Sequence, residues 1–145
     1  MREKCIVSEE ILKELCKEWQ ERLRLQAWNI ECGIYRERNF SNNGCDGENE
    51  YDLRNGNSLI RILDPLDYPK SRFPQDMEAT LVHELLHLHF APFEPEKDDG
   101  LDHHIMEHTI CILSETLVAL KRENTLCKDN FNDLIGKQGD VKCTL

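Results

Sequence analysis

The sequence predicts an α+β domain in which an N-terminal helix is followed by three short strands and then by two helices. Three observations support this order. Apolar residues first recur with the spacing of a helix, then alternate with polar residues as in strands, and finally recur with helical spacing again. The chain has 145 residues, which fits one domain. We therefore expect a small antiparallel or mixed sheet covered by helices.

The first helix is expected over residues 9–25. Ser8 can cap its N-terminus, because a serine hydroxyl can accept a hydrogen bond from the backbone of the first helical turn. The apolar residues of this segment follow helical spacing, and its other face is charged. They are Ile11, Leu12, Leu15, Cys16, Trp19 and Leu23. This pattern predicts an amphipathic helix on the surface of the domain.

Three strands are expected next. In AWNIECGIYRE every second residue from Trp28 to Ile34 is apolar, which is a strand pattern. The turn-rich stretch 41–49 reads as a loop. A second strand is expected around 50–53 and a third over 58–63 (SLIRIL). An Asn-Gly pair between these two strands predicts a hairpin.

Two helices complete the predicted fold. After a proline-rich stretch, Gln75 or Asp76 can start a helix that runs to about Phe90. A further helix is expected from about Asp102 to Arg122.

The chain loses clear periodicity after Asn124. We therefore predict one domain over residues 1–123 and a C-terminal tail over residues 124–145. The tail contains at most a short amphipathic turn at 131–135.

Composition limits the classes of function. The net charge of −10 argues against a nucleic-acid-binding surface, which would be basic. No stretch approaches the roughly 20 apolar residues of a membrane helix, and the N-terminus lacks the apolar run of a signal peptide. We therefore expect a cytoplasmic protein that binds neither nucleic acid nor a membrane. The seven cysteines are odd in number and lack CxxC spacing, so free thiols are expected, with Cys16 and Cys111 buried on apolar helix faces.

The stretch LVHELLHLHF (81–90) carries the chemistry. His83, Glu84 and His87 form an HExxH pattern on a predicted helix. Residues four apart lie on one face of a helix, so both imidazoles can reach one metal ion. Glu84 lies farther round the helix, close enough to polarise a water without binding the metal. Because two nitrogen ligands suit Zn²⁺, the pattern predicts a zinc site.

The third histidine of this stretch is not expected to bind the same metal. At about 100° per residue, His89 falls on nearly the opposite side of the helix from His83 and His87. We expect His89 to lie at a helix end or an interface. The longer HExxHxxGxxH pattern is absent, because Phe90 and Phe93 stand where its glycine and third histidine belong. The metzincin class is therefore disfavoured.

A third ligand is expected from the next helix, LDHHIMEHTICILSETLVAL. Its apolar stripe comprises Met106, Ile110, Leu113, Leu117 and Leu120. At about 100° per residue, His103 lies about 50° from the centre of that stripe and Glu107 about 90°. The other polar candidates point largely to solvent: His104, His108 and Glu115. Glu107 is the favoured ligand and His103 the alternative; if Glu107 binds the metal, His103 could hydrogen-bond it or stabilise an oxyanion.

With these residues the sequence resembles the gluzincin branch of zinc metallopeptidases, in its smallest single-domain form: the minigluzincins and related phage- or prophage-borne HExxH proteins. The resemblance covers roughly residues 9–122. It rests on TLVHELLHLH (80–89), on the glutamate of MEHTICILSETL (106–117) and on the order of helices and strands. It implies a zincin-like fold and an endopeptidase that acts on an intracellular protein or peptide.

The resemblance also implies a role for each residue. His83, His87 and Glu107 would be zinc ligands and Glu84 the general base, with His103 as a further catalytic candidate. In such folds an extended peptide lies along the edge of the sheet. The strand nearest the motif in sequence is 58–63, so we expect it to be that edge.

Two other hypotheses remain open at the level of sequence. The protein could be a zinc-stabilised binding module without catalysis, acting on a phage or host regulator. Alternatively, an enzyme could be latent, with Cys127 or Cys143 of the tail occupying the open position of the metal.

Overall fold

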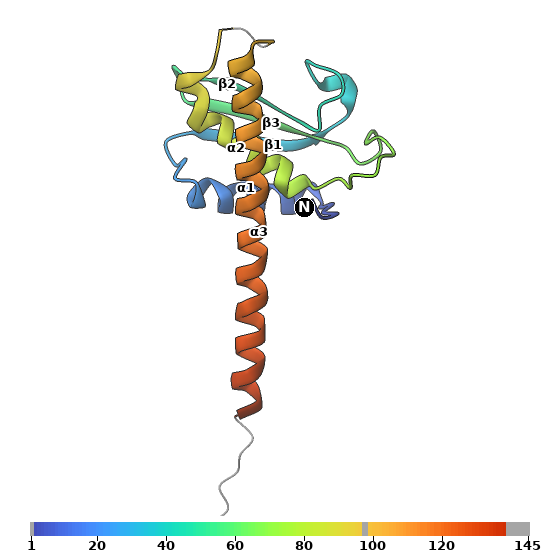
Figure 1. The fold of residues 1–145 in the computed structure, drawn as a ribbon, viewed down its shortest axis with the longest axis vertical. Coiled ribbons are helices and arrows are strands. Elements are labelled where there is room, and N and C mark those ends of the chain that lie inside the picture. Colours follow the sequence, from blue (N-terminus) through green and yellow to red (C-terminus); the bar gives the residue numbers. More distant parts are fainter. Residues whose placement is uncertain (1, 97–98, 139–145) are drawn as a thin grey trace, which may run out of the picture.

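Helices and strands follow one another in the predicted order. The computed structural model describes residues 2–96 and 99–138. Its elements are α1 (Glu9–Arg22), β1 (Asn29–Tyr35), β2 (Gly47–Asp52), β3 (Asn57–Leu63), α2 (Met77–Phe90) and α3 (Leu101–Gln138), with short 3₁₀ turns at Glu37–Asn39 and Ala91–Phe93. The three strands form one sheet beside the helices (Figure 1). The predicted α+β class is therefore confirmed.

The ends of α1 and α2 follow from local chemistry. Ser8 and Asp76 cap the two helices, and each side chain accepts a hydrogen bond from the backbone N–H three residues later, at 3.3 and 3.0 Å. Helix α1 ends at Arg22 rather than at residue 25. The chain turns there, because Arg24 adopts a left-handed conformation with φ of 59°.

The sheet has the strand order β1-β3-β2, so β3 is its central strand. Strand β3 pairs in parallel with β1 and antiparallel with β2, which makes the sheet mixed. The predicted hairpin joins β2 to β3, and Gly56 adopts the positive φ of 67° that this turn requires. Strand β2 begins at Gly47, earlier than predicted, because Gly47 pairs with Ile62 and draws the end of the expected loop into the sheet.

The core lies between the sheet and the helices. Ile60 and Ile62 of the central strand are fully buried and belong to the same apolar cluster as Leu81 and Leu85 of α2. Helix α2 contacts α1, α3 and two of the strands, so it is enclosed on most sides. This enclosure explains why most residues of α2 are buried.

Helix α3 is fixed to the rest of the fold by buried charges. The guanidinium of Arg122 holds both carboxylate oxygens of Asp76, at 2.9 and 3.1 Å. Lys121 donates to Glu78 at 2.6 Å, and the indole of Trp19 donates to the same Glu78 oxygen at 2.8 Å. Because Asp76 and Glu78 are almost completely buried, each depends on these partners to offset the loss of water.

Helix α3 continues well past its predicted end. It reaches Gln138 without interruption, so the prediction that the helix stops near Arg122 and that irregular chain begins after Asn124 is wrong. The segment contains no proline, and its first glycine is Gly136, so nothing in its backbone ends the helix earlier. The periodicity that locates a buried helix fades there, since residues 123–135 are all exposed.

Within residues 2–96 and 99–138, no helix combines the length and the apolar character needed to cross a membrane. Although α3 is long, charged residues occur throughout it. The cytoplasmic location expected from the sequence stays a prediction.

Candidate metal centre

Helices α2 and α3 bring three donor side chains to one point. The Nε2 atoms of His83 and His87 lie 3.2 Å apart on one face of α2. The carboxylate of Glu107 reaches them from α3, with one oxygen 3.4 Å from His83 Nε2 and the other 3.2 Å from His87 Nε2. The potential ligand atoms of all three residues lie within 4.8 Å of one another, so the group could hold a metal ion.

The spacing of these atoms fits zinc. In a tetrahedral zinc shell with bonds of about 2.0–2.1 Å, neighbouring ligand atoms are about 3.3 Å apart. The two Nε2 atoms are 3.2 Å apart, and each faces its own Glu107 oxygen, at 3.4 Å from His83 and 3.2 Å from His87. Two imidazoles and one carboxylate, with room for a fourth ligand from the cleft, form a donor set typical of catalytic zinc sites.

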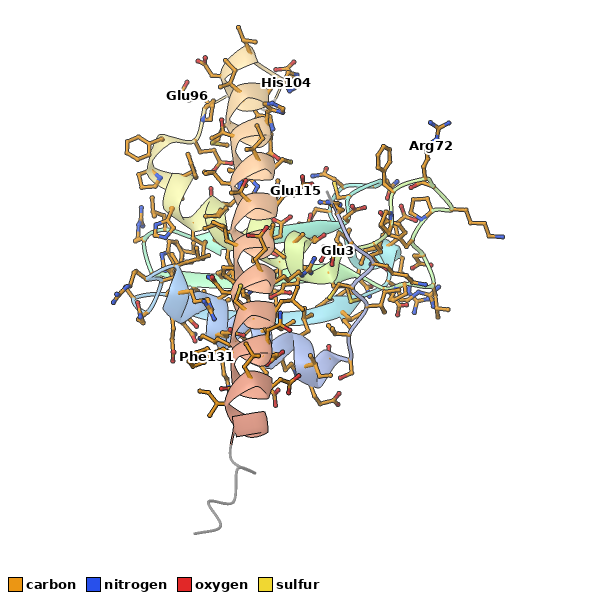
Figure 2. The ribbon with its side chains drawn as sticks, turned by 60° about the horizontal axis from the view of Figure 1, so that its bottom comes forward. Glu3, Arg72, Glu96, His104, Glu115 and Phe131 are labelled. Carbon is orange, nitrogen blue, oxygen red and sulfur yellow. The ribbon has the colours of Figure 1, made fainter. Side chains whose placement is uncertain are left out.

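The other histidines lie outside this group. His89 Nε2 lies 2.7 Å from the carbonyl oxygen of Leu23 at the end of α1, so this side chain sits at an interface on the far side of α2, as predicted. His104 and His108 are exposed, also as predicted. Figure 2 shows His104 on the flank of α3. In the described part of the chain, Glu107 and not His103 completes the group.

His103 nevertheless lines the same cleft, one helical turn before Glu107. Its Nδ1 atom is buried and has no hydrogen-bond partner among the described residues. A buried ring nitrogen without a partner carries a desolvation cost that no described contact offsets.

Contacts among the three donor side chains shift their pKa values. For His83, burial favours the neutral ring, but contacts with Cys111 and Glu107 and the charge of Glu84 outweigh it and raise its pKa. For His87, burial lowers the pKa, and a charged His83 only 3.2 Å away opposes a second proton. Hydrogen bonding from His83 lowers the pKa of Glu107. The centre therefore keeps its carboxylate ionised, as a ligand requires.

Glu84 lies beside the three donors and is only 7% exposed. Burial raises its pKa to about 7, and the nearby carboxylates of Glu107 and Glu48 add to the effect. A carboxyl group with a pKa near neutrality can both accept and return a proton at physiological pH. This is the property that a general base needs.

Strand β2 holds Glu84 in place. Asn49 donates a hydrogen bond to the Glu84 carbonyl at 2.8 Å, and Ser58 donates to Asn49 at 2.7 Å. Gly47 packs directly against α2, because a Cβ at this position would lie 2.6 Å from Thr80 Cγ2 and 2.9 Å from Glu84 Oε1. A side chain at residue 47 would therefore displace the carboxylate or the helix.

We expect Gly47→Ala to lower stability by about 1–3 kcal/mol through this overpacking. Any hydrolytic activity should also fall, since Glu84 is pushed from its position. Gly33→Ala in β1 is the matched control, because its Cβ would meet the side chains of Glu9 and Tyr35, away from the centre. Urea denaturation and rate measurements compare the two variants. Equal effects would show that Gly47 has no special role at the site.

Cys111 is the partner of His83 on the side away from the other donors. Its Sγ lies 3.6 Å from His83 Nδ1, so it can accept a hydrogen bond from Nδ1–H, and this tautomer leaves Nε2 free for a metal. Cys111 follows Glu107 by four residues and therefore lies on the same face of α3. It is half-buried at the centre rather than buried in the apolar core, which corrects the sequence prediction; Cys16 is buried as predicted.

We expect Cys111→Ala to weaken zinc binding about 10-fold, because outer partners of metal-binding histidines typically contribute that much. Cys111→Ser should recover part of the affinity, since a hydroxyl oxygen can also accept a hydrogen bond from Nδ1–H. Competition with a chromophoric chelator measures both variants. Unchanged affinity in the alanine variant would exclude this contact as a determinant of metal binding.

The centre opens into a cleft of about 480 Å³. Strand β2 lines one side through Gly47, Glu48, Asn49 and Tyr51. The prediction that strand 58–63 forms the edge at the site is wrong: this segment is β3, which is paired on both sides, whereas β2 has no strand on its outer side in the described part of the chain. The prediction relied on sequence order, whereas the order of strands in a sheet is set by which strands pair.

Other side chains of the cleft come from distant parts of the sequence. Arg2 binds Asp46 at 3.1 Å on one rim. Its Nε also binds Glu115 at 3.2 Å, so Glu115 is half-buried and paired. The prediction that Glu115 points to solvent is therefore wrong. On the other rim, the hydroxyl of Tyr51 donates to Glu94. Burial and this contact raise the pKa of Tyr51.

The latency hypothesis is wrong for Cys127. Cys127 is exposed on α3, on the same rigid helix as Glu107. Twenty residues of helix separate the two by about 30 Å, so the thiol cannot reach the centre. Cys143 lies outside the described residues.

Several residues of the site carry no clear sequence signal. Gly47, Asn49 and Arg2 reach it only through the pairing of strands and the path of the N-terminal segment. Cys111 could have been found, since it repeats the four-residue spacing that links His103 to Glu107.

No protein-family model, curated protein sequence or solved structure matches the chain. The assignment of a function therefore depends on the geometry and chemistry of the site itself.

Proposed function

We propose that this protein is a zinc-dependent endopeptidase that hydrolyses a peptide bond in a protein or peptide. The observation that carries the proposal is the meeting of two imidazoles and one carboxylate at zinc-like separations of 3.2–3.4 Å, with a buried carboxylic acid beside them in one cleft. The HExxH segment resembles that of gluzincins, and we include a zincin-like fold of that type in the proposal.

Each residue has a distinct task. His83, His87 and Glu107 would hold zinc, which when bound supplies Lewis acidity toward the scissile carbonyl and the attacking water. Glu84 accepts a proton from that water as the new C–O bond forms. It then delivers the proton to the leaving amine as the C–N bond breaks.

The cleft offers further groups to a substrate. His103 lines the cleft one helical turn before Glu107, so its imidazole is the group that we assign to hydrogen-bond the developing oxyanion. An extended peptide can add to the free edge of β2, whose residues line the cleft. This replaces β3 as the proposed peptide-binding strand.

A direct test combines metal analysis with cleavage. We expect the purified full chain to bind one zinc per molecule, and the zinc-loaded protein to cleave an unfolded protein such as reduced casein. Removal of the metal by a chelator should abolish cleavage, and added zinc should restore it. Mass spectrometry of the products identifies the bonds that are cut. A protein that binds zinc in full but cleaves no member of a broad peptide library would contradict the proposal.

A further inference from the structure

The second half of α3 lies outside the body of the protein. Lys121 and Arg122 form ion pairs with acidic residues of α1 and of the α2 N-terminus, whereas residues 123–135 are all exposed. Figure 1 shows this part of α3 running clear of the other elements. At 1.5 Å per residue, the segment from Glu123 to Gln138 is about 24 Å long. A helix of this length is only marginally stable in water unless something packs against it.

One side of this helix carries an apolar stripe. Its residues are separated alternately by four and three positions, which is the spacing of a coiled-coil seam. They are Leu113, Leu117, Leu120, Cys127, Phe131 and Leu134, with Asn124 at the one polar position. The repeat extends over three heptads, the length that distinguishes a coiled coil from a chance pattern.

Most of the stripe lies apart from the face that α3 packs against the body, although Leu117 is partly buried against the core. That face is marked by Ile110, Ser114 and Val118, which are almost completely buried and lie roughly a quarter-turn round the helix from the stripe. By contrast, Leu120 is 50% exposed and Phe131 is 62% exposed. Figure 2 shows Phe131 on the distal half of α3. The body therefore leaves most of the stripe uncovered.

The charges beside the stripe indicate what covers it. In the heptad abcdefg with Asn124 at a, Glu123 is at g and Lys128 is at the following e position. In a parallel, in-register pair of identical helices, each Glu123 faces Lys128 of the second copy, so two attractive pairs form. Asn124 meets its own counterpart, and a single asparagine at an a position favours parallel two-stranded pairing.

The outward positions agree with this arrangement. Thr125, Asp129, Asn132 and Asp133 occupy the b, c and f positions and are polar, with Leu126 as the apolar exception. We propose that residues 113–134 of α3 form a parallel two-stranded coiled coil with a second copy of this chain. The interface is distinct from the metal centre and does not depend on the proposed peptidase activity.

Light scattering after size exclusion tests the proposal on the full chain. We expect a particle of twice the chain mass of 17.0 kDa. The double variant Phe131→Glu, Leu134→Glu should be monomeric, because it places charge in the seam. Asn132→Glu, on the outer face, is the matched control and should stay dimeric. A monomeric wild-type chain at about 100 µM, a concentration at which most of the chain would be dimeric for a Kd of about 1 µM, overturns the proposal.

A crosslink through Cys127 tests whether the two helices are parallel and in register. As a d residue it faces its counterpart, so an added copper–phenanthroline oxidant should take one electron and one proton from each thiol and form a disulfide between the two copies. Cys127→Ser should abolish that covalent dimer while leaving the non-covalent dimer intact. A dimer that is not crosslinked through Cys127 overturns the parallel register.

Exchanging the charges of Glu123 and Lys128 tests the proposed ion pairs between the two copies independently. Glu123→Lys should weaken the dimer several-fold, and the double variant Glu123→Lys, Lys128→Glu should restore it. Because both variants keep the seam and are far from the centre, their zinc content should equal that of the wild type. If residues 139–145 instead cover the stripe, their deletion would create a dimer from a monomer, and that result also overturns the proposal.

Discussion

Glu84→Gln is expected to abolish peptide cleavage while leaving zinc content and fold intact. The amide has the shape of the carboxylic acid but cannot take a proton from the attacking water, so the rate should fall by about 10²–10⁴-fold. The metal ligands are unchanged in this variant. Cleavage of a fluorogenic peptide, zinc analysis and thermal denaturation together measure the three properties.

A matched control is Glu115→Gln on α3, which removes a carboxylate outside the cleft that pairs with Arg2. It should retain activity close to that of the wild type. The Glu84 variant also separates the proposed enzyme from a zinc-stabilised binding module. If Glu84→Gln keeps the full biological activity of the wild type, the peptidase proposal fails and the binding module is favoured.

Glu107→Ala is expected to remove the third ligand. We expect zinc affinity to fall on the order of 10³-fold, which corresponds to about 4 kcal/mol. The stabilisation that zinc gives the folded protein should decrease by a similar amount, because a ligand stabilises only the state that binds it. Chelator competition and denaturation with and without zinc give two independent readouts.

His103→Ala is the comparison that decides between the two candidates on α3. Its zinc affinity should stay close to that of the wild type, while its cleavage rate should fall because the hydrogen-bonding group is lost. The opposite result, with full zinc occupancy in Glu107→Ala and loss in His103→Ala, would show that the ligand assignment is wrong.

The position of Glu107 illustrates how far sequence reasoning reaches. Helical periodicity placed both Glu107 and His103 near the inner side of α3, but angles about one helix axis cannot tell which side chain meets a second helix. The packing of α3 across α2 brings the Glu107 carboxylate to 3.4 Å or less from both histidines. Only the relative placement of the two helices makes this distinction.

The predictions of the edge strand and of the length of α3 were wrong for different reasons. Pairing with both neighbours puts β3 at the centre of the sheet, and no local pattern in SLIRIL reveals its neighbours. The distal half of α3 has no body to pack against, so it lacks the wide apolar face by which a buried helix is recognised. Its apolar residues instead follow the narrower spacing of a coiled-coil seam.

By itself the sequence determined the order of the elements, the Ser8 helix cap and the shared face of His83 and His87. These features depend on contacts within a few residues, where backbone geometry fixes which side chains meet. The tertiary structure alone decided that Glu107 joins them, that Cys111 contacts His83, and that β2 lines the cleft. Those contacts join residues far apart in the chain, so they depend on how the helices and strands pack together.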